Sequence, residues 1–374
     1  MYNKHFSSVL IKWYDLHKRD LPWRDTKDPY IIWISEIILQ QTRVEQGYDY
    51  FNRFITRYPN VQALAQSTEE EVLKYWQGLG YYSRARNLYK TARQISEKGT
   101  FPDSFDALKA LSGVGDYTAA AIASFAYGEK VAVVDGNVYR VLSRYYGIPE
   151  AIDTTKGKKT FAALAHESLP RQELCSDYNQ AIMDFGATQC QPRAAQCDTC
   201  PLQDSCYAYL HDMVYALPVK SKRPSVKQRF INYLLLEVDG KTAFFKREGN
   251  DIWKGLYEPY LYETAEKAPV EETVRRISAF DFLRNTKYGS IGVIATDLHH
   301  QLTHRLITCN AYALKLSRRP SDAEFGRKAI WVDNTDITGL AVSRLVEQVL
   351  DHYFRSSVSQ NETRQTHISH HQPT

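Results

Sequence analysis

The sequence lacks any run of about 18 consecutive apolar residues, the length that a helix needs to cross a lipid bilayer. Residues 1–6 pass directly into an amphipathic pattern without the apolar core of a secretory signal. The chain also has no long internal repeat. We therefore expect a protein of the cytoplasm.

A strong excess of either charge is also missing. The formal net charge is +4 over 374 residues, which permits an acidic partner without identifying one, because groove binding needs local rather than global basicity. The length predicts two or three domains. An apolar content of 43% is enough to bury real cores and excludes global disorder.

Cysteine is scarce outside one short segment. Of the 6 cysteines, Cys175 and Cys309 stand alone and the others fall within residues 190–206. In a reducing compartment such crowding favours metal ligation over a disulfide framework. A cubane iron–sulfur cluster and a tetrahedral zinc ion both accept four thiolates, so the spacing alone leaves the two open. The four ligands would be Cys190, Cys197, Cys200 and Cys206.

Helical periodicity dominates residues 1–210. Apolar residues recur at three- and four-residue spacing, which predicts an all-α domain. Asp28 followed by Pro29 is typical of a helix start, with the acid as N-cap and the proline at the first helical position. The next ten residues are apolar on most faces, so we expect this helix at the centre of the domain.

The pattern changes after the cysteines. Residues 211–229 combine prolines with cations and predict a basic linker. Residues 230–355 predict an α+β domain, and residues 356–374, which lack an apolar run, predict a disordered tail. Within the α+β domain we expect strands at 230–238, 242–246, 291–296, 306–316 and 329–332, a turn at Asp239-Gly240 and a closing helix at 340–354.

Two carboxylates occupy unlike settings. Glu36 lies in the apolar helix, where burial without a purpose would be costly and should raise its pKa; the alternative is a residue that faces a polar partner at the helix edge. Asp135 follows the apolar run 131–134 and precedes a helical pattern, which indicates an N-cap. We expect the helix amides to lower the pKa of Asp135.

Gly113, Val114 and Gly115 form a third signal. Two glycines around a small apolar residue let the backbone turn sharply between helices, with amides facing outward beside a helix N-terminus. Such amides suit a DNA phosphate. The alternative is a plain interhelical turn.

Several segments together resemble one family. The segments SEIILQQT (35–42), LPWR (21–24) and GLGYYSRARNL (78–88) resemble the MutY-type adenine DNA glycosylases of the endonuclease III or helix-hairpin-helix superfamily. The cysteine spacing and the hairpin LSGVGDYTA (111–119), which has Ser112 where proline is usual, resemble the same superfamily. The resemblance covers residues 1–210 almost continuously and the rest more loosely.

The resemblance implies a fold, a cofactor and an activity. It implies an all-α helix-hairpin-helix glycosylase domain whose four cysteines hold a [4Fe-4S] cluster, followed by a Nudix-like domain that checks for 8-oxoguanine. In that second domain, residues 253–258 fit a strand segment. It implies a monomer that acts on double-stranded DNA, at the nucleoid in a bacterium. The reaction would hydrolyse the N-glycosidic bond of adenine opposite 8-oxoguanine or guanine.

The resemblance also implies roles for individual residues. The catalytic group would be Glu36, Asp135, Tyr117 and Asn137. The base pocket would contain Trp23, Arg24, Leu39 and Gln180. DNA would be contacted by Gln41, Tyr81, Gly113, Val114, Gly115, Thr118, Thr303 and His304. Of these, Gln41 and Tyr81 would wedge into the base stack near the base opposite the adenine, with Tyr82 in place of Tyr81 if the register differs by one residue.

Departures from the pattern decide between alternatives. Bifunctional relatives carry a lysine that attacks the sugar where this chain has Tyr117, so we expect a monofunctional enzyme that leaves an abasic site. This argues against an endonuclease III-like pyrimidine glycosylase/lyase. Retention of Glu36 and Asp135 argues against a non-catalytic iron–sulfur DNA-binding protein. The C-terminal domain has Leu302-Thr303-His304 in place of Phe-Ser-His and lacks the Glu-rich helix that binds Mg²⁺ in Nudix hydrolases, so nucleotide hydrolysis is not expected.

Overall fold

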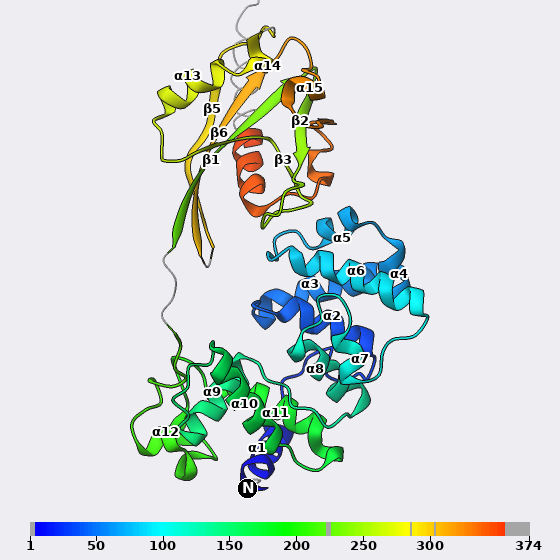
Figure 1. The fold of residues 1–374 in the computed structure, drawn as a ribbon, viewed down its shortest axis with the longest axis vertical. Helices are drawn as coiled ribbons and strands as arrows, with labels where there is room; N and C mark the ends of the chain where they lie inside the picture. The colour runs from blue at the N-terminus through cyan, green and yellow to red at the C-terminus, as the bar shows by residue number, and fades with distance from the viewer. Residues whose placement is uncertain (1–3, 222–225, 285, 303, 356–374) are drawn as a thin grey trace, which may run out of the picture. The chain divides into compact units, whose positions relative to one another are not determined.

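A computed structural model describes residues 4–221, 226–284, 286–302 and 304–355 (Figure 1). The expected fold class is confirmed, because helices dominate up to residue 210 and a mixed sheet follows. By their internal contacts the residues group into two compact units, Met1–Ser67 with Asn87–Arg223 and Thr68–Arg86 with Pro224–Thr374. The expected tail and the expected contact of Thr303 lie outside the described residues.

The helices of the N-terminal part are short and closely spaced. Among the described residues, no helix has the length and apolarity that a membrane span requires. The helices are α1 (Lys4–His17), α2 (Pro29–Leu39), α3 (Val44–Arg57), α4 (Val61–Gln66), α5 (Glu69–Tyr75), α6 (Ser83–Lys98), α7 (Phe105–Lys109), α8 (Asp116–Tyr127), α9 (Gly136–Tyr146), α10 (Thr155–Glu167), α11 (Cys175–Thr188) and α12 (Tyr207–Leu210).

Helix α2 begins where its sequence predicts. The Asp28 side chain accepts a hydrogen bond of 2.8 Å from the backbone N–H of Tyr30, and Pro29 occupies the first turn. Eight of its residues, from Tyr30 to Ile38, are buried, including Glu36. A helix buried on most faces holds its one acid away from water, and this prepares that acid for chemistry.

Helices α7 and α8 form a hairpin around residues 110–115. Helix α7 ends at Lys109, and α8 begins at Asp116 with Gly115 as its N-cap. Gly113 adopts φ +75°, and a Cβ added there would lie 2.5 Å from the Cβ of Asn87. Backbone conformation and close approach therefore both require glycine at this position.

The second unit contains a mixed sheet. Its strand order is β3-β2-β1-β6-β5, with β4 paired to β1 and β7 to β2; β1 and β6 are parallel and the other pairs antiparallel. The elements are β1 (Lys227–Val238), β2 (Lys241–Lys246), β3 (Tyr257–Glu258), β4 (Tyr260–Thr264), α13 (Val270–Ser278), α14 (Asp281–Arg284), β5 (Gly292–Gln301), β6 (Arg305–Lys315), α15 (Asp322–Phe325), β7 (Ile330–Asp333) and a closing helix over residues 344–355.

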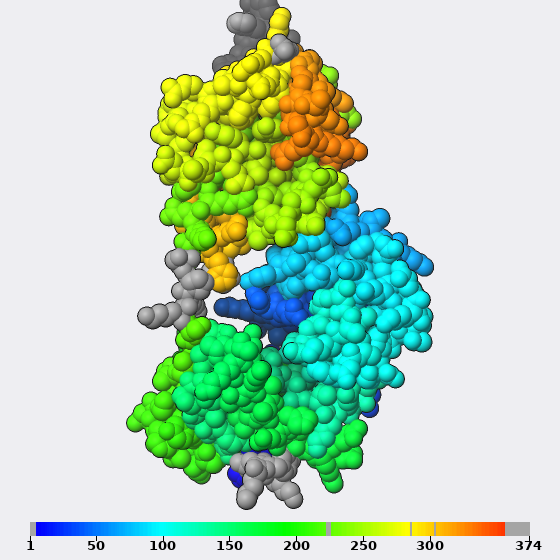
Figure 2. All heavy atoms as spheres, in the orientation of Figure 1, coloured from blue at the N-terminus to red at the C-terminus, as the bar shows by residue number. Residues whose placement is uncertain are grey.

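Alternate residues of β1 pack on opposite faces of this sheet. Leu234, Leu236 and Val238 join one apolar cluster that also contains Ile277 of α13. Tyr233 and Leu235, which point the other way, are fully buried too, so both faces of the central strand are covered. In the space-filling view the atoms of this unit form one closely packed body (Figure 2).

Some boundaries differ from those expected. Residues 227–229, assigned to the linker, already belong to β1, and the closing helix begins at 344 rather than 340. The strand expected over 253–258 is wrong for 253–255, which form a turn. Gly255 adopts φ +85° there, and only Tyr257 and Glu258 are in a strand, because a left-handed residue cannot continue the pleat.

Candidate active site

Glu36 is buried and has a specific partner. Its side chain is 7% exposed, and the hydroxyl of Tyr117, in the first turn of α8, donates a hydrogen bond to its Oε2. Burial raises the pKa of Glu36, as expected, although the Tyr117 hydrogen bond and the charge of Arg24 oppose this; the charge of Asp135 acts with burial. A carboxyl that keeps its proton above the usual pH range suits a general acid.

Tyr117 is a neutral phenol in this setting. Burial first, and then the negative charges of Glu36 and Asp135, raise the pKa of Tyr117 well above its ordinary value. The hydroxyl therefore remains a hydrogen-bond donor. It connects two helices, α2 and α8, at the point where the acid is held.

Asp135 is the N-cap of α9, as expected. Its Oδ1 accepts hydrogen bonds from the backbone N–H groups of Asn137 (2.9 Å) and Val138 (2.8 Å), and its Oδ2 accepts one from the Asn137 side chain at 2.7 Å. The expected lowering of its pKa is wrong: burial raises the pKa of Asp135 more than these hydrogen bonds and the charge of Arg140 lower it. For the pKa of Asp135, the effect of exclusion from water is larger than the effect of the helix amides.

Asn137 is fixed by a second residue that the sequence did not indicate. Arg140 is 8% exposed and donates to Asn137 Oδ1 (2.8 Å), to the carbonyl of Gly186 (2.6 Å) and to the carbonyl of Cys190 (2.8 Å). One guanidinium thus joins the Asp135 cap to the start of the cysteine loop. The sequence signal that could have identified this role is an arginine among the apolar positions of α9.

The expected base-pocket residues Arg24 and Gln180 lie together. Arg24 Nη1 donates to Gln180 Oε1 at 2.8 Å, and its Nη2 donates to Asp184 Oδ1 at 3.0 Å. Asp184, which the sequence analysis missed, is fully buried on α11 and also accepts three hydrogen bonds from Arg19. It follows a methionine and precedes a phenylalanine, and this apolar context is the same signal that identified Glu36.

The other two expected pocket residues form apolar contacts. Trp23 is 4% exposed, and its ring packs edge-on against Phe51 with centroids 4.9 Å apart. Leu39 ends α2 and contacts the position of Gly47, where an added Cβ would lie 2.7 Å from its Cδ2. Both residues are therefore held by packing against α3.

Two of the hairpin residues expected to contact DNA have buried side chains. Val114 is 7% exposed, and its backbone N–H donates to the Leu111 carbonyl at 3.3 Å. Thr118 is 1% exposed, and its hydroxyl accepts a hydrogen bond of 3.0 Å from Gln40. The Thr118 hydroxyl is thus bonded within the helical unit, and Gly113 and Gly115 are exposed in the turn. Contact of the hairpin with DNA stays a prediction.

Gln41 and Tyr81, the two expected wedge residues, share an unusual backbone. Gln41 has φ +60° and Tyr81 has φ +49°, which is the left-handed region that L side chains rarely adopt. Gln41 is exposed, and the Tyr81 ring is 49% exposed. Tyr82 is 3% exposed, so the structure favours Tyr81 over the alternative register.

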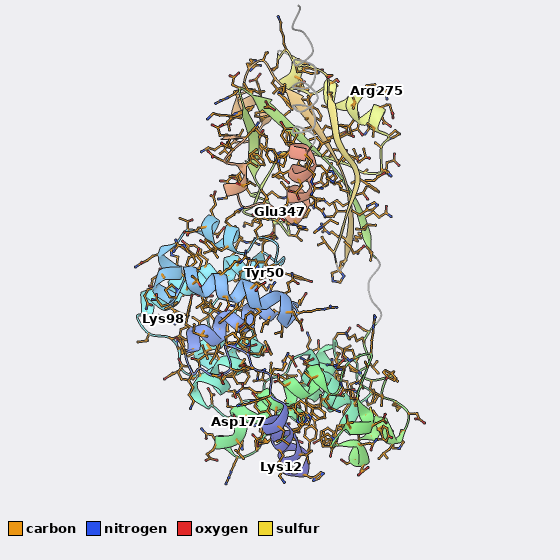
Figure 3. All side chains as sticks on the ribbon, turned by 180° about the vertical axis from the view of Figure 1, so that it is seen from behind. Lys12, Tyr50, Lys98, Asp177, Arg275 and Glu347 are labelled. Atoms are coloured by element: carbon orange, nitrogen blue, oxygen red, sulfur yellow. The ribbon has the colours of Figure 1, made fainter. Side chains whose placement is uncertain are left out.

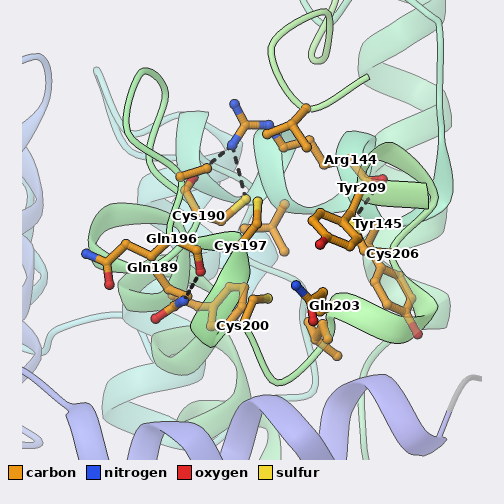
Figure 4. A pocket seen from close by; sticks show the side chains of 15 residues that line it. Arg144, Tyr145, Gln189, Cys190, Gln196, Cys197, Cys200, Gln203, Cys206 and Tyr209 are labelled. Atoms are coloured by element: carbon orange, nitrogen blue, oxygen red, sulfur yellow. Dashed lines mark hydrogen bonds between the residues drawn. The ribbon is translucent and has the colours of Figure 1, made fainter. Parts of the chain in front are cut away.

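The four clustered cysteines line one pocket together with Arg144 (Figure 4). Arg144 donates to Cys190 Sγ at 3.2 Å and to the Gln191 carbonyl at 2.9 Å. Burial raises the pKa of Cys200 to about 12, so metal binding there must release a proton. Within the described residues, no three His, Cys, Asp or Glu side chains are close enough together to hold a metal ion as they stand. The four cysteines nevertheless share one pocket, and four thiolates are the ligands that an iron–sulfur cluster requires.

His304 lies at the end of the β5–β6 hairpin. Its side chain is exposed, and its carbonyl accepts a hydrogen bond of 3.1 Å from the backbone N–H of Lys227. This leaves the imidazole available at the rim of the second unit.

Two known families match the two parts of the chain. Residues 34–167 match the HhH-GPD superfamily of base excision DNA repair proteins, and residues 232–352 match the NUDIX domain family. A solved thermostable thymine-DNA glycosylase is 33% identical with a TM-score of 0.52, covering 56% of this chain and 96% of that one.

Named relatives extend the match over nearly the whole sequence. The adenine DNA glycosylase of Buchnera aphidicola subsp. Acyrthosiphon pisum is 32% identical over 93% of this chain and 97% of its own length. The human adenine DNA glycosylase is 42% identical over 54% of this chain and 39% of its own length. From this coverage, the chain belongs to the adenine DNA glycosylase family of helix-hairpin-helix base excision repair proteins.

Proposed function

We propose that this base excision repair glycosylase removes adenine opposite 8-oxoguanine or guanine in double-stranded DNA and leaves an abasic site. The observation that carries the proposal is the buried Glu36 carboxyl, bonded to Tyr117 and within electrostatic reach of Asp135. Burial raises the pKa of both carboxyls, and their hydrogen bonds distinguish them: Glu36 accepts one from Tyr117, whereas Asp135 accepts three from Asn137 and Val138 that favour its charged form.

The chemistry follows from these groups. The adenine must leave the base stack to reach Glu36. Glu36 gives its proton to a ring nitrogen of adenine while the C1′–N9 bond breaks and its electron pair goes to the base. The Asp135 carboxylate stabilises the positive charge that develops on the sugar, and a water molecule adds to C1′ and releases a proton.

Supporting residues orient this reaction. Asn137 fixes the Asp135 carboxylate through a hydrogen bond of 2.7 Å. Arg24, held by Asp184, offers its charge beside Glu36 and so limits how far the pKa of Glu36 rises. Tyr117 is a phenol rather than an amine and forms no Schiff base with the opened sugar, which supports hydrolysis without strand cleavage.

We further propose that the four cysteines hold a [4Fe-4S] cluster. Its ligands would be Cys190, Cys197, Cys200 and Cys206, and when bound it would brace the loop beside α9. Arg140 and Arg144 donate to the carbonyl groups of this loop, so the loop and the Asp135 cap share one set of hydrogen bonds.

The experiment is single-turnover cleavage of duplexes that contain adenine opposite 8-oxoguanine, guanine or thymine, developed with and without alkali. Strand breaks that appear only after alkali, and only for the first two duplexes, are the expected result. A duplex with thymine opposite guanine tests for thymine excision, the activity for which the solved thymine-DNA glycosylase is named. Excision of thymine instead of adenine, or breaks without alkali, would refute the proposal.

A further inference from the structure

Residues 68–86 belong by their contacts to the second unit, although they lie within the helical part of the sequence. This segment comprises α5, the loop that carries Tyr81, and the first residues of α6. Its polar contacts are concentrated at two positions, Lys74 and Gln77, and neither is required by the helix itself.

Lys74 uses all three donors of its ammonium group. Its Nζ donates to the carbonyl of Thr338 (2.6 Å), to the carbonyl of Leu340 (2.9 Å) and to Gln77 Oε1 (3.1 Å). The first two acceptors lie just before the closing helix of the second unit. Hydrogen bonds from a charged donor to carbonyls are stronger than neutral ones, so this contact is specific.

Gln77 continues the same junction. Its Oε1 accepts a hydrogen bond of 3.2 Å from the backbone N–H of Val342, and its Nε2 donates to the carboxylate of Glu347. Glu347, labelled in Figure 3, lies on the closing helix. The Tyr82 hydroxyl donates to the Val342 carbonyl at 3.3 Å.

Residues 68–86 also contact the loop and strand that follow β2. The Tyr257 hydroxyl donates to Glu70 at 3.2 Å, and Arg86 donates to the Lys254 carbonyl at 2.7 Å. A Cβ added at Gly255 would lie 3.0 Å from Leu73, so the two surfaces approach closely. These contacts join the segment to the sheet and the closing helix of this unit.

The loop between these anchors presents Tyr81. Gly78 and Gly80 also adopt left-handed backbones, with φ +89° and +76°, and the Gly80 carbonyl accepts a hydrogen bond of 3.0 Å from the Trp76 indole. Tyr81 follows directly and precedes the buried Tyr82. Its position is therefore set by residues that are bonded to the second unit.

We infer that the second unit positions Tyr81 for insertion beside the base opposite the adenine, through Lys74 and Gln77 as positioning residues. The inference rests on the proposed function. Reading of that base by the second unit and insertion of the Tyr81 ring then belong to one compact unit. Discrimination of 8-oxoguanine from guanine depends on both at once.

The test compares Lys74→Met with the wild type, with Lys74→Arg, and with Lys241→Met as a matched control. The Lys241 side chain forms a surface ion pair of 3.0 Å with Asp333 in the same unit. Lys74→Met keeps the side-chain stem and removes the three donors. Single-turnover rates are measured for adenine opposite 8-oxoguanine and opposite guanine, and thermal melting checks that each variant is folded.

Lys74→Met should reduce the 8-oxoguanine preference about tenfold, the effect of losing hydrogen bonds from a charged group. It should also reduce the fluorescence rise of 2-aminopurine placed next to the opposite base, which reports unstacking by the Tyr81 ring. Lys74→Arg should restore much of both signals, and Lys241→Met should match the wild type.

Equal preference and equal fluorescence in Lys74→Met and Lys241→Met would overturn the inference. If Lys74→Met does not fold, Glu347→Ala, which leaves Lys74 in place, gives the same comparison. A wild type that excises no adenine from either duplex would instead refute the proposed function, so the two failures are distinguishable.

Discussion

The side chain of Glu36 combines burial with one hydrogen bond, and this combination determines when it holds a proton. Its pKa is raised by burial above the ordinary value of about 4.3. Because a general acid must be protonated, the single-turnover rate should fall as pH increases through this raised pKa. Glu36→Gln should reduce the rate at least about 100-fold and remove this alkaline limb. A rate that increases with pH through the same range would contradict the acid role.

The same burial has a consequence for stability. A carboxyl whose pKa is higher in the folded than in the unfolded state destabilises the fold once pH exceeds the unfolded value. Below that value both states are protonated and the penalty disappears. Glu36 therefore carries an energetic cost at neutral pH that its chemical role explains.

Asp135 has a structural role and a chemical role that substitution can separate. Asparagine is also a good N-cap, so Asp135→Asn should keep the start of α9 while it removes the charge that stabilises the sugar. Asp135→Ala should lose activity and about 1 kcal/mol of the free energy of unfolding. Urea unfolding of both variants, with their excision rates, checks this. Full activity of Asp135→Asn would show that only the cap matters.

Local sequence signals predicted the positions of these residues in the fold, but they did not predict the direction of the pKa shift of Asp135. The caps Asp28 and Asp135 follow from neighbours in the chain, and so does the burial of Glu36 in an apolar helix. The raised pKa of Asp135 depends on how much water the folded chain excludes, and no local pattern contains that information. The role of Asp184 depends on Arg19 and Arg24, which lie between α1 and α2 and are distant in sequence.

At the scale of elements, the hairpin between α7 and α8 depends on Gly113 for two reasons. Gly113→Ala would place a side chain at φ +75° and also against Asn87. Gly99 is a matched control, because it has φ +76° and no atom within 4 Å of an added Cβ. We expect Gly99→Ala to cost about 1 kcal/mol from the backbone alone and Gly113→Ala about 1–3 kcal/mol more, measured by urea unfolding. Equal losses would show that the contact with Asn87 is unimportant.

Helix α9 connects the Asp135 cap to the cysteine loop through Arg140. Arg140→Gln would remove the charged donor of the Gly186 carbonyl and the shorter of the two hydrogen bonds to the Cys190 carbonyl, which keeps one of 3.4 Å from Arg144, at a cost of about 2–3 kcal/mol. With the proposed [4Fe-4S] cluster bound, we expect this variant to lose iron to a chelator faster than the wild type, as measured by iron per protein. Arg93→Gln is the control, because Arg93 is 57% exposed with one ion pair of 3.9 Å. Identical iron loss in the two variants would disconnect α9 from the loop.

Element boundaries depend partly on tertiary structure. The turn at 253–255 has strand-like residues, but Gly255 must accommodate the close approach of Leu73, which is far away in the sequence. The hairpin turn at Asp239-Gly240 was predictable because both residues tolerate the left-handed backbone that they adopt. Turns that are set by local chemistry are visible in the sequence, and turns that are set by packing are not.

At the scale of the whole molecule, the tertiary contacts of residues 68–86 group them with a different unit from the residues that flank them in the sequence. Nothing in the composition of this segment separates it from the helices around it, so the sequence placed it in the N-terminal domain. Its contacts place it with the sheet and the closing helix. The unit that contains the mixed sheet thus also contains Tyr81.

This grouping predicts which parts of the molecule open together. Contiguous contacts unfold as cooperative units, so the backbone amides of α5 should exchange hydrogen with the same free energy as those of β1 and β6. Hydrogen-exchange mass spectrometry of the intact protein in low urea measures this. Lys74→Met should lower the protection of α5 and of residues 338–347 while α9 and α11 keep theirs, because only the former share its hydrogen bonds. If α5 instead exchanges at the same rate as α9 and α11, the segment belongs to the helical unit. The second unit would then have no structural basis for positioning Tyr81.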